Sequence, residues 1–394
     1  MCVVIHLESY ARIEADLSAI AACLSQSLSS VTQLSIQLRG EDAHGAARNP
    51  LVRAAAAAVR VLGPLCGPLT HITVSGEVRV WGENTYTRLL RAASAVCAPS
   101  LTHFSFSMQA RLPTAQLQLQ LGGGQEDKVL ECGCDFLIDV TACTALRSLT
   151  RLTHLRLERG SLCDGEAWAA LPSSLQSLDM CSPYCSLPQH LLPLPHPSLL
   201  PSLHSLSLLS CGCHRLVQLL RACPKLQQLK LVELRSPDCA SEQQDLRDIL
   251  VHPMAAFPVL PTVTDVCFDF ANKRPCQFLP AHPLKLLHHI PRAIPNLEVL
   301  RLDNVLLLDS DLTQLDGCAS LRKLRLNYSD HVTGAALLRL ATALPSLMGV
   351  QVFLCKLVTP EHSQAIVQLM HERGSAEGDQ CVRTMFGTQY SAQG

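Results

Sequence analysis

Aromatic and charged residues are both scarce in this sequence. Phenylalanine, tryptophan and tyrosine make up 4% of the 394 residues, which argues against an aromatic-lined cofactor pocket. Charged residues make up 16%, and 32 basic residues against 33 acidic residues leave a formal net charge of -1. A general nucleic-acid binder needs a basic excess to neutralise phosphates. We therefore expect no nucleic-acid partner.

Long apolar runs are also missing. Arg53 and Arg60 flank the alanine-rich stretch, so it cannot extend into an uncharged run of 18 residues. The N-terminus has no basic residue before its short apolar run, and Glu8 follows at once, which is unlike a signal peptide. The 19 cysteines are scattered, and a free thiol beside leucine behaves as a small hydrophobe. We expect a reduced chain in the cytosol or nucleus, without membrane association.

Known catalytic and metal-binding motifs are absent from the sequence. There is no H-E-x-x-H or G-x-S-x-G, and the glycines at 122–124 lack the Gly-Lys-Ser/Thr of a phosphate loop. Three close cysteine pairs do not have zinc-site spacing. They are Cys132 with Cys134, Cys181 with Cys185, and Cys211 with Cys213. Asp309, Asp311 and Asp316 are interpreted as soluble loop carboxylates. We predict no enzymatic activity, no cofactor and no metal site.

Leucine is the abundant residue, and it recurs in a pattern. It fills about 70 positions, roughly twice its ordinary share. An apolar-x-x-apolar-x-apolar triplet occurs at Val31-Leu34-Ile36, Leu69-Ile72-Val74, Leu101-Phe104-Phe106, Leu152-Leu155-Leu157, Leu175-Leu178-Met180, Leu203-Leu206-Leu208, Leu226-Leu229-Leu231, Val263-Val266-Phe268, Leu297-Leu300-Leu302, Leu321-Leu324-Leu326 and Leu347-Val350-Val352. Many first positions lie about 20–29 residues apart, as in leucine-rich repeats, and longer spacings imply insertions.

Each triplet predicts a strand followed by a helix. Its fourth and sixth positions alternate with polar residues, which is the period of a strand. Apolar residues then recur with helical period, for example at Leu337, Leu338 and Leu340, and again at Ile366 and Met370. One such unit buries too little apolar surface by itself, so neighbouring units must stack. The helix supplies the crossover that parallel strands require.

Four phrases carry a family resemblance. They are ACPKLQQLKL (222–231), AIPNLEVLRLDN (293–304), CASLRKLRLN (318–327) and HVTGAALLRLATALPSL (331–347). With them the chain resembles leucine-rich repeat proteins, most of all those with ribonuclease-inhibitor-like or F-box-associated repeats. The resemblance implies an α/β solenoid, or horseshoe, with a parallel concave sheet, a mostly helical convex side and irregular insertions. No F-box is visible in residues 1–60.

The repeats suggest one long domain and a tail. We expect a single leucine-rich repeat domain over residues 1–372, with about 11–12 repeats. Insertions are expected near 110–145, 182–201 and 234–262, and a disordered tail over 373–394. Ile5 and Leu7 fit the fourth and sixth positions of a first repeat. The chain would then open inside a repeat without a polar cap, so upstream sequence or a partner is expected to cover that end.

The third, fifth and seventh positions of the repeats are predicted to line the concave face, with neighbouring strands about 4.8 Å apart. Candidate partner-binding residues there are Arg156, Lys230, Arg301, Asp303, Lys323 and Arg325. In one interpretation the basic residues grip an acidic partner segment, because guanidinium groups bind carboxylates in bidentate fashion. In the other they form a solvated face, with Asp269 and Asp303 balancing their charge.

Three histidines occupy successive third positions: His71, His103 and His154. Imidazole is a common metal ligand, but a repeated hydrophilic residue in a degenerate Leu-Thr-His phrase explains the pattern equally simply. His103 and His154 are neighbours only if the insertion at 110–145 adds no strand between them. We favour the second interpretation.

The architecture indicates a non-enzymatic scaffold that binds a protein on its concave face, because an extended open surface lacks the deep pocket that catalysis needs. Three alternatives stay open. The chain could be the substrate-recognition part of a ubiquitin-ligase receptor that lacks its F-box, or a structural subunit of a larger assembly. It could also be a small-GTPase-activating protein, a family with similar repeats, although the tail holds only Glu377 and Asp379 as acidic residues. The oligomeric state is left open.

Overall fold

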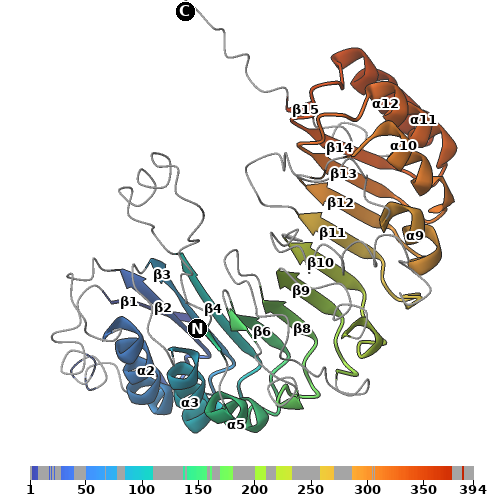
Figure 1. Ribbon diagram of the computed structural model, residues 1–394. Coiled ribbons are helices and arrows are strands. Elements are labelled where there is room, and N and C mark those ends of the chain that lie inside the picture. Colours follow the sequence, from blue (N-terminus) through green and yellow to red (C-terminus); the bar gives the residue numbers. More distant parts are fainter. Residues whose placement is uncertain are drawn as a thin grey trace, which may run out of the picture. The chain divides into compact units, whose positions relative to one another are not determined.

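A computed structural model describes most of the repeats. The described residues are 2–7, 17, 19, 22, 28–39, 50–66, 68–77, 85–109, 136–137, 140–157, 160–161, 169–180, 200–209, 219–232, 258–269, 286–303, 305, 307–374 and 384–385. The chain divides into two compact units (Figure 1), Met1–Leu203 (unit 1) and His204–Gly394 (unit 2).

Unit 1 contains a parallel sheet with its strands in chain order. The strands are β1 (Cys2–Leu7), β2 (Gln33–Arg39), β3 (His71–Glu77), β4 (His103–Gln109), β6 (His154–Leu157) and β8 (Ser177–Met180). Strand β4 pairs directly with β6, so the insertion at 110–145 adds no strand between them. Two short strands, β5 (Phe136–Leu137) and β7 (Gly160–Ser161), form a separate pair.

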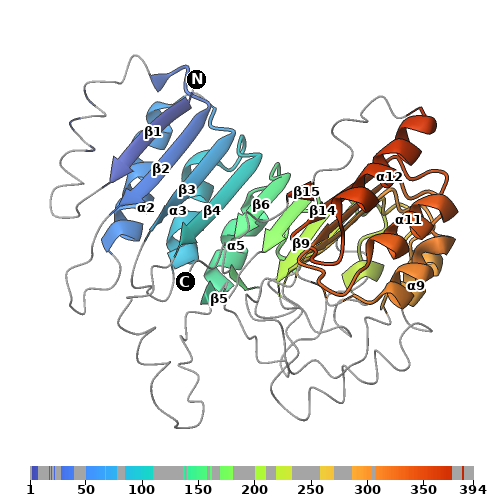
Figure 2. The same cartoon turned by 90° about the horizontal axis from the view of Figure 1, so that it is seen from above.

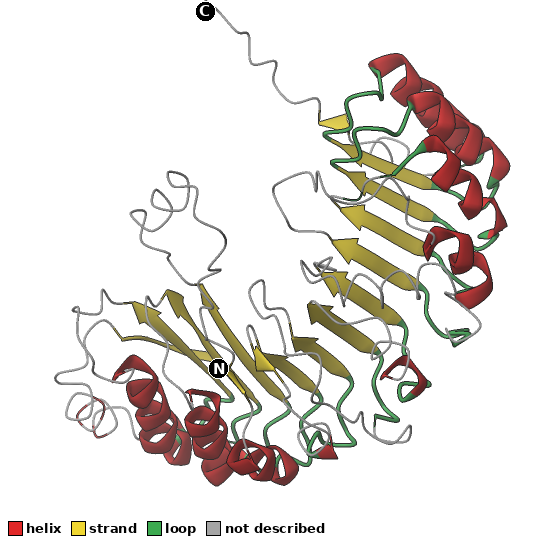
Figure 3. Ribbon diagram, in the orientation of Figure 1, coloured by secondary structure: helices red, strands yellow, loops and turns green. Residues whose placement is uncertain are grey.

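The helices of unit 1 lie on one face of this sheet, as Figures 2 and 3 show. They are α2 (Pro50–Leu62), α3 (Thr85–Cys97) and α5 (Val140–Ser148). Helix α3 lies between α2 and α5 and contacts both. Alanines at 55–58 and leucines 89 and 90 are buried on these helices, so small and large apolar side chains fill the layer between helices and strands.

Unit 2 repeats the same arrangement. Its parallel strands are β9 (Ser205–Leu209), β10 (Gln228–Val232), β11 (Asp265–Asp269), β12 (Val299–Asp303), β13 (Lys323–Asn327), β14 (Gly349–Phe353) and β15 (Thr384–Met385). Its helices are α9 (Leu286–Ala293), α10 (Asp309–Leu312), α11 (Gly334–Ala343) and α12 (Pro360–Glu372). Helices α11 and α12 confirm the helical segments predicted from Leu337, Leu340, Ile366 and Met370, all of which are buried.

The strand register confirms the predicted triplets. Leu300 of β12 pairs with Leu324 of β13, which pairs with Val350 of β14. All members of the eleven triplets are buried except Met180, which is partly exposed. Each unit is therefore a leucine-rich repeat stack, in which equivalent side chains of successive repeats form one continuous core.

The predicted register of the first repeat is wrong by two residues. Val3 pairs with Leu34 and Ile5 with Ile36, so these two residues hold the fourth and sixth positions that were predicted for Ile5 and Leu7. A shift of two residues keeps every side chain on the same face of a strand. The apolar pattern alone could not distinguish these two registers.

Side-chain hydroxyls tie neighbouring repeats together. The residue before the first apolar position donates a hydrogen bond to the carbonyl of the preceding repeat's first position. Ser100 Oγ donates to Leu69 O at 2.8 Å, and Ser346 Oγ donates to Leu321 O at 2.9 Å. Thr262 Oγ1 does the same to Leu226 O at 2.7 Å. These bonds satisfy backbone carbonyls where one strand begins beside the next.

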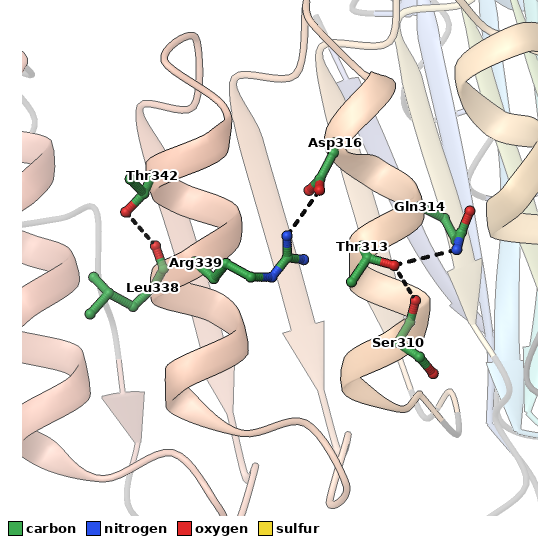
Figure 4. Close-up of polar contacts among 7 residues, drawn as sticks. All are labelled: Ser310, Thr313, Gln314, Asp316, Leu338, Arg339 and Thr342. Atoms are coloured by element: carbon green, nitrogen blue, oxygen red, sulfur yellow. Dashed lines mark hydrogen bonds and ion pairs between the residues drawn. The ribbon is translucent and has the colours of Figure 1, made fainter.

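The acidic residues after β12 are structural and do more than keep a loop soluble. Asp311 is buried, and its Oδ2 accepts a hydrogen bond from Leu308 N at 2.8 Å. Asp309 accepts from both the amide and the hydroxyl of Thr333, each at 2.8 Å, and Thr333 in turn caps α11. Asp316 forms an ion pair of 2.9 Å with Arg339 on α11 (Figure 4). Asp309 and Asp316 thus tie residues 309–317 to Thr333 and α11, whereas Asp311 holds the start of its own helix, α10.

Several predicted features lie outside the described residues. These are most of the insertions at 110–145, 182–201 and 234–262, the glycines at 122–124 and the three close cysteine pairs. Within the tail predicted to be disordered, Thr384–Met385 form β15 beside β14. In the described part of the chain, every helix is too short or too polar to cross a membrane.

Candidate functional site

The face of each sheet opposite the helices carries the third, fifth and seventh positions of the repeats. We call it the open face, and it corresponds to the predicted concave face. Register pairs confirm that these positions form columns, as in Lys323 beside Val299 and Arg325 beside Arg301. The side chains of Arg301 and Arg325 are 45% and 40% exposed, while the leucines between them are buried.

The open face of unit 2 is crossed by ion pairs. Arg301 Nη2 on β12 lies 3.1 Å from Asp265 Oδ2 on β11. Arg325 Nε on β13 lies 3.3 Å from Asp303 Oδ1 on β12. The guanidinium of Arg325 also lies over the ring of Phe353 on β14, 5.3 Å from its centroid, which is a cation–π contact. These contacts link four successive strands from β11 to β14.

Burial affects the carboxylates of this network. Burial raises the pKa of Asp303, and the positive charge of Arg325 opposes that shift only in part. Burial likewise raises the pKa of Asp265, against the opposing effect of Arg301. Each arginine thus lies beside a half-buried carboxylate and favours its charged form.

The six candidate residues fall on both units. Arg301, Asp303, Lys323 and Arg325 lie together on the adjacent strands β12 and β13. The other two lie further off: Lys230 is on β10, and Arg156 belongs to unit 1, where it pairs with Asp179 at 3.5 Å.

The charge balance differs in part from the sequence interpretation. Asp303 balances Arg325, as expected. Arg301 pairs instead with Asp265, which the sequence analysis did not single out. Asp265 occupies a third position and Arg301 a fifth position on the next strand, so the contact runs diagonally across the columns. A pattern read one column at a time does not reveal diagonal pairs.

The open face of unit 1 carries the histidine column, which we define as His71, His103 and His154. The rings of His71 and His103 are stacked with centroids 4.0 Å apart and planes 13° apart. The rings of His103 and His154 stack at 4.0 Å and 10°. Their neighbours in the next column are Thr73, Ser105 and Arg156, so two hydroxyl groups and one guanidinium border the stack.

A threonine before each histidine holds its ring in place. Thr102 Oγ1 lies 2.8 Å from His103 Nδ1 and 3.0 Å from Thr70 O. Thr70 and Thr153 make the same two contacts, Thr70 with His71 and Thr32 O, and Thr153 with His154 and Thr102 O. A carbonyl can only accept, so the hydroxyl gives its proton to the carbonyl and must accept from Nδ1–H. Each histidine then carries a proton on Nδ1, and in the neutral ring the lone pair is on Nε2.

This geometry does not suit a shared metal ion. Nearly parallel rings direct their Nε2 lone pairs along parallel lines, whereas ligands of one ion must converge on it. In the described part of the chain, no group of three or more histidine, cysteine or acidic residues could hold a metal. The repeated Leu-Thr-His phrase was the sequence signal for this structure, because the threonine is as regular as the histidine.

The described cysteines are free thiols, and most are buried. Burial raises the pKa of Cys97, Cys223 and Cys318 to about 12. Cys267 sits at a fifth position among the charges of unit 2, and its pKa is raised to about 11, chiefly by burial. Thiols of such high pKa are poor nucleophiles, and these act as small core residues.

A rim of apolar side chains follows the last strands of unit 2. Tyr328 and Leu354 come directly after β13 and β14, and they are 53% and 39% exposed. Both have left-handed backbone angles, with φ of 56° and 52°, a conformation that is uncommon for such bulky residues. Tyr328 N donates to Phe353 O at 3.0 Å, which brings the two turns together. Leu357 is also exposed, so three large apolar side chains lie in the turns that follow β13 and β14.

Comparison with known proteins gives matches to solved structures alone. No family model and no curated protein matches the sequence. The Rad7 and Elc1 complex in yeast is similar at 14% identity over 89% of this chain and 85% of that chain, with a TM-score of 0.41. A TLR13–ssRNA13 complex is similar at 14% identity over 84% of this chain and 33% of that chain (TM-score 0.36). A leucine-rich repeat protein of Leptospira interrogans is similar at 12% identity over 93% of this chain and 98% of that chain (TM-score 0.26).

Proposed function

We propose that this chain is a non-enzymatic scaffold that binds a protein partner through the open faces of its leucine-rich repeats. The alternation of buried and outward-facing side chains along each strand carries this proposal. Buried leucines at the fourth and sixth positions hold the fold, so the side chains between them are available for contact. Arg156, Arg301 and Arg325 have side chains 51%, 45% and 40% exposed on these faces. Arginine is enriched where proteins meet.

For unit 2 we propose an acidic partner segment, held by Arg301, Lys323 and Arg325, with Lys230 and Asp303 beside them. Each arginine meets its aspartate through a single nitrogen, Nη2 in Arg301 and Nε in Arg325. A guanidinium carries five N–H donors, so it can bind a second carboxylate without losing the first. The aspartates orient the arginines, and Tyr328 and Leu354 offer apolar contact at the edge.

The first step of the test is affinity purification of the full chain from its native cells, followed by identification of the bound protein. The dissociation constant of that purified partner is then measured for the wild type and for the double variant Arg301→Glu/Arg325→Glu. We expect the double variant to bind at least about tenfold more weakly, because two attractive charges become repulsive. Equal binding by the wild type and the double variant would exclude the acidic-segment contact.

Arg339→Glu is the matched control. Arg339 is 43% exposed and pairs with Asp316 at 2.9 Å, much as Arg301 pairs with Asp265, but it lies on a convex helix. We expect this variant to bind as tightly as the wild type. If Arg339→Glu weakens binding as much as the double variant does, and both variants melt like the wild type, the partner does not use the open face.

The two more specific roles implied by the family resemblance can each be tested by a separate measurement. A small-GTPase-activating protein would accelerate GTP hydrolysis by a purified GTPase, and a ubiquitin-ligase receptor would co-purify with ligase subunits. The scaffold proposal expects neither activity to be necessary for partner binding. If the chain accelerates GTP hydrolysis or co-purifies with ligase subunits, its open face acts within a larger assembly. The comparison of Arg301→Glu/Arg325→Glu with Arg339→Glu still tests whether the open face binds the partner.

A further inference from the structure

The histidine column places three titratable rings face to face on the open face of unit 1. Each ring is stacked at 4.0 Å on its neighbour, and each Nδ1–H is engaged by a threonine hydroxyl. We propose that the column is a proton-responsive element, which stays stacked while its middle ring is uncharged and separates its rings when that ring takes up a proton. This inference goes beyond partner binding, and its test requires the protein alone.

His103 has a different position from the other two histidines of the column. It is the middle ring, so it has a stacked neighbour on both faces, whereas His71 and His154 each have one. A proton on His103 would lie 4.0 Å from any charge on either neighbour. Like charges at that distance repel strongly at a partly buried site. Protons are therefore expected to reach the middle ring last.

The described third and fifth positions around the column hold one carboxylate, and it is already paired. At the third and fifth positions of β2, β3, β4, β6 and β8, the described charged or titratable side chains are the three histidines, Arg156 and Asp179. Asp179 is engaged by Arg156 at 3.5 Å. Gln33, Ser35, Thr73, Ser105 and Ser177 are neutral. A second positive charge in the column thus meets hydroxyls, amides and the charge of Arg156.

The pKa shifts of the column agree with this geometry. Burial, with smaller contributions from the charges of His154 and His71, lowers the pKa of His103 to about 4. Burial also lowers the pKa of His154, again with a contribution from His71. His103 is then uncharged at neutral pH, and the middle of the column becomes cationic only as the medium turns acidic.

Histidine NMR on the full chain tests the proposal. The ring Cε1–H resonances of His103 and of the exposed His331 are followed against pH in the wild type. His103 should titrate near pH 4, well below the ordinary histidine pKa of 6.5. His71→Asn and His154→Asn should each raise the midpoint of His103, and the double variant should raise it most, because asparagine keeps a donor for the threonine but carries no charge. Coincident midpoints for His103 and His331 in the wild type would overturn the proposal.

Ring separation needs its own readout. Amide exchange of β3 and β4, corrected for intrinsic rates, should lose protection below the midpoint of His103 in the wild type. His103→Asn should keep that protection, and His331→Asn, outside the column, should behave like the wild type. Unchanged protection through the midpoint in the wild type would show that the column charges without opening, which contradicts the proposal. The wild-type titration decides the first point even where a variant fails to fold.

Discussion

The two open faces are built on the same repeat but present different chemistry. In unit 1 the histidine column and neighbouring hydroxyls form neutral hydrogen bonds, and the Arg156–Asp179 pair lies at β6 and β8. In unit 2, ion pairs and a cation–π contact run from β11 to β14. The buried triplets are alike in both units. The buried first, fourth and sixth positions therefore determine the fold, while the third, fifth and seventh positions can vary in chemistry without disturbing it.

The largest expected effect is common to both units. Phe106→Ala in unit 1 and Leu324→Ala in unit 2 each leave a cavity at a side chain that is at most 1% exposed. We expect losses of roughly 3–5 kcal/mol for the phenylalanine and 2–5 kcal/mol for the leucine in the free energy of unfolding. Chemical denaturation measures both. A negligible loss in one unit would break the equivalence of their cores.

The next largest effect is expected at the carboxylate of Asp309 in unit 2. Asp309→Ala removes two hydrogen bonds to Thr333 and leaves the start of α11 without its support. We expect a loss of about 1–2 kcal/mol in stability, the size of a lost helix cap. Asp316→Ala serves as a control, because it removes an exposed ion pair and should cost less. Equal thermal melts for Asp309→Ala and the wild type would contradict this role.

Acidification should destabilise unit 1 before unit 2. Unfolding lets His103 take up a proton near pH 6.5 rather than near 4, so its contribution to stability falls as the pH drops through that range. The pKa values of Asp265 and Asp303 are raised by burial, so their contribution is fully present below pH 3.8 and is lost as the pH rises. Peptide-resolved amide exchange from about pH 7 to about pH 4.5 should show protection lost in unit 1 first. Equal loss in both units would be evidence against this difference.

The smallest effect is expected at the exposed ion pairs. Arg301→Gln should change the free energy of unfolding by less than about 1 kcal/mol, because the arginine is solvated and its pair is screened by salt. Arg156→Gln in unit 1 should do the same. Denaturation in low and high salt measures both changes. A loss of several kcal/mol would show that these pairs serve stability and are not simply available for a partner.

Much of the fold was predictable because one physical rule repeats. Apolar residues three and five positions after a leucine predict a buried strand, and stacking makes that signal cumulative. The columns of the open face followed from the same register, so Arg301 and Arg325 were expected as neighbours and are paired. The first repeat was misplaced because a two-residue shift preserves the apolar pattern there.

The contacts between columns were less predictable. Asp265 reaches Arg301 diagonally, and Asp309 reaches Thr333 across a helix and a strand. Such contacts depend on rotamers and turn geometry, which no single repeat encodes. The stacking of the histidines needed both the regular threonine and the direct pairing of β4 with β6. The threonine pattern is visible in the sequence. The insertion at 110–145 hides the direct pairing of β4 with β6.

The most direct test of the account is an alanine scan along β13. The free energy of unfolding is measured for Lys323→Ala, Leu324→Ala, Arg325→Ala, Leu326→Ala and Asn327→Ala by chemical denaturation. Large losses should occur at Leu324 and Leu326, and small ones at the three residues that face outward, because side chains of a strand alternate between core and solvent. Losses of similar size along the strand, or the largest losses at Lys323 and Arg325, would contradict a core of leucines beneath an open binding face.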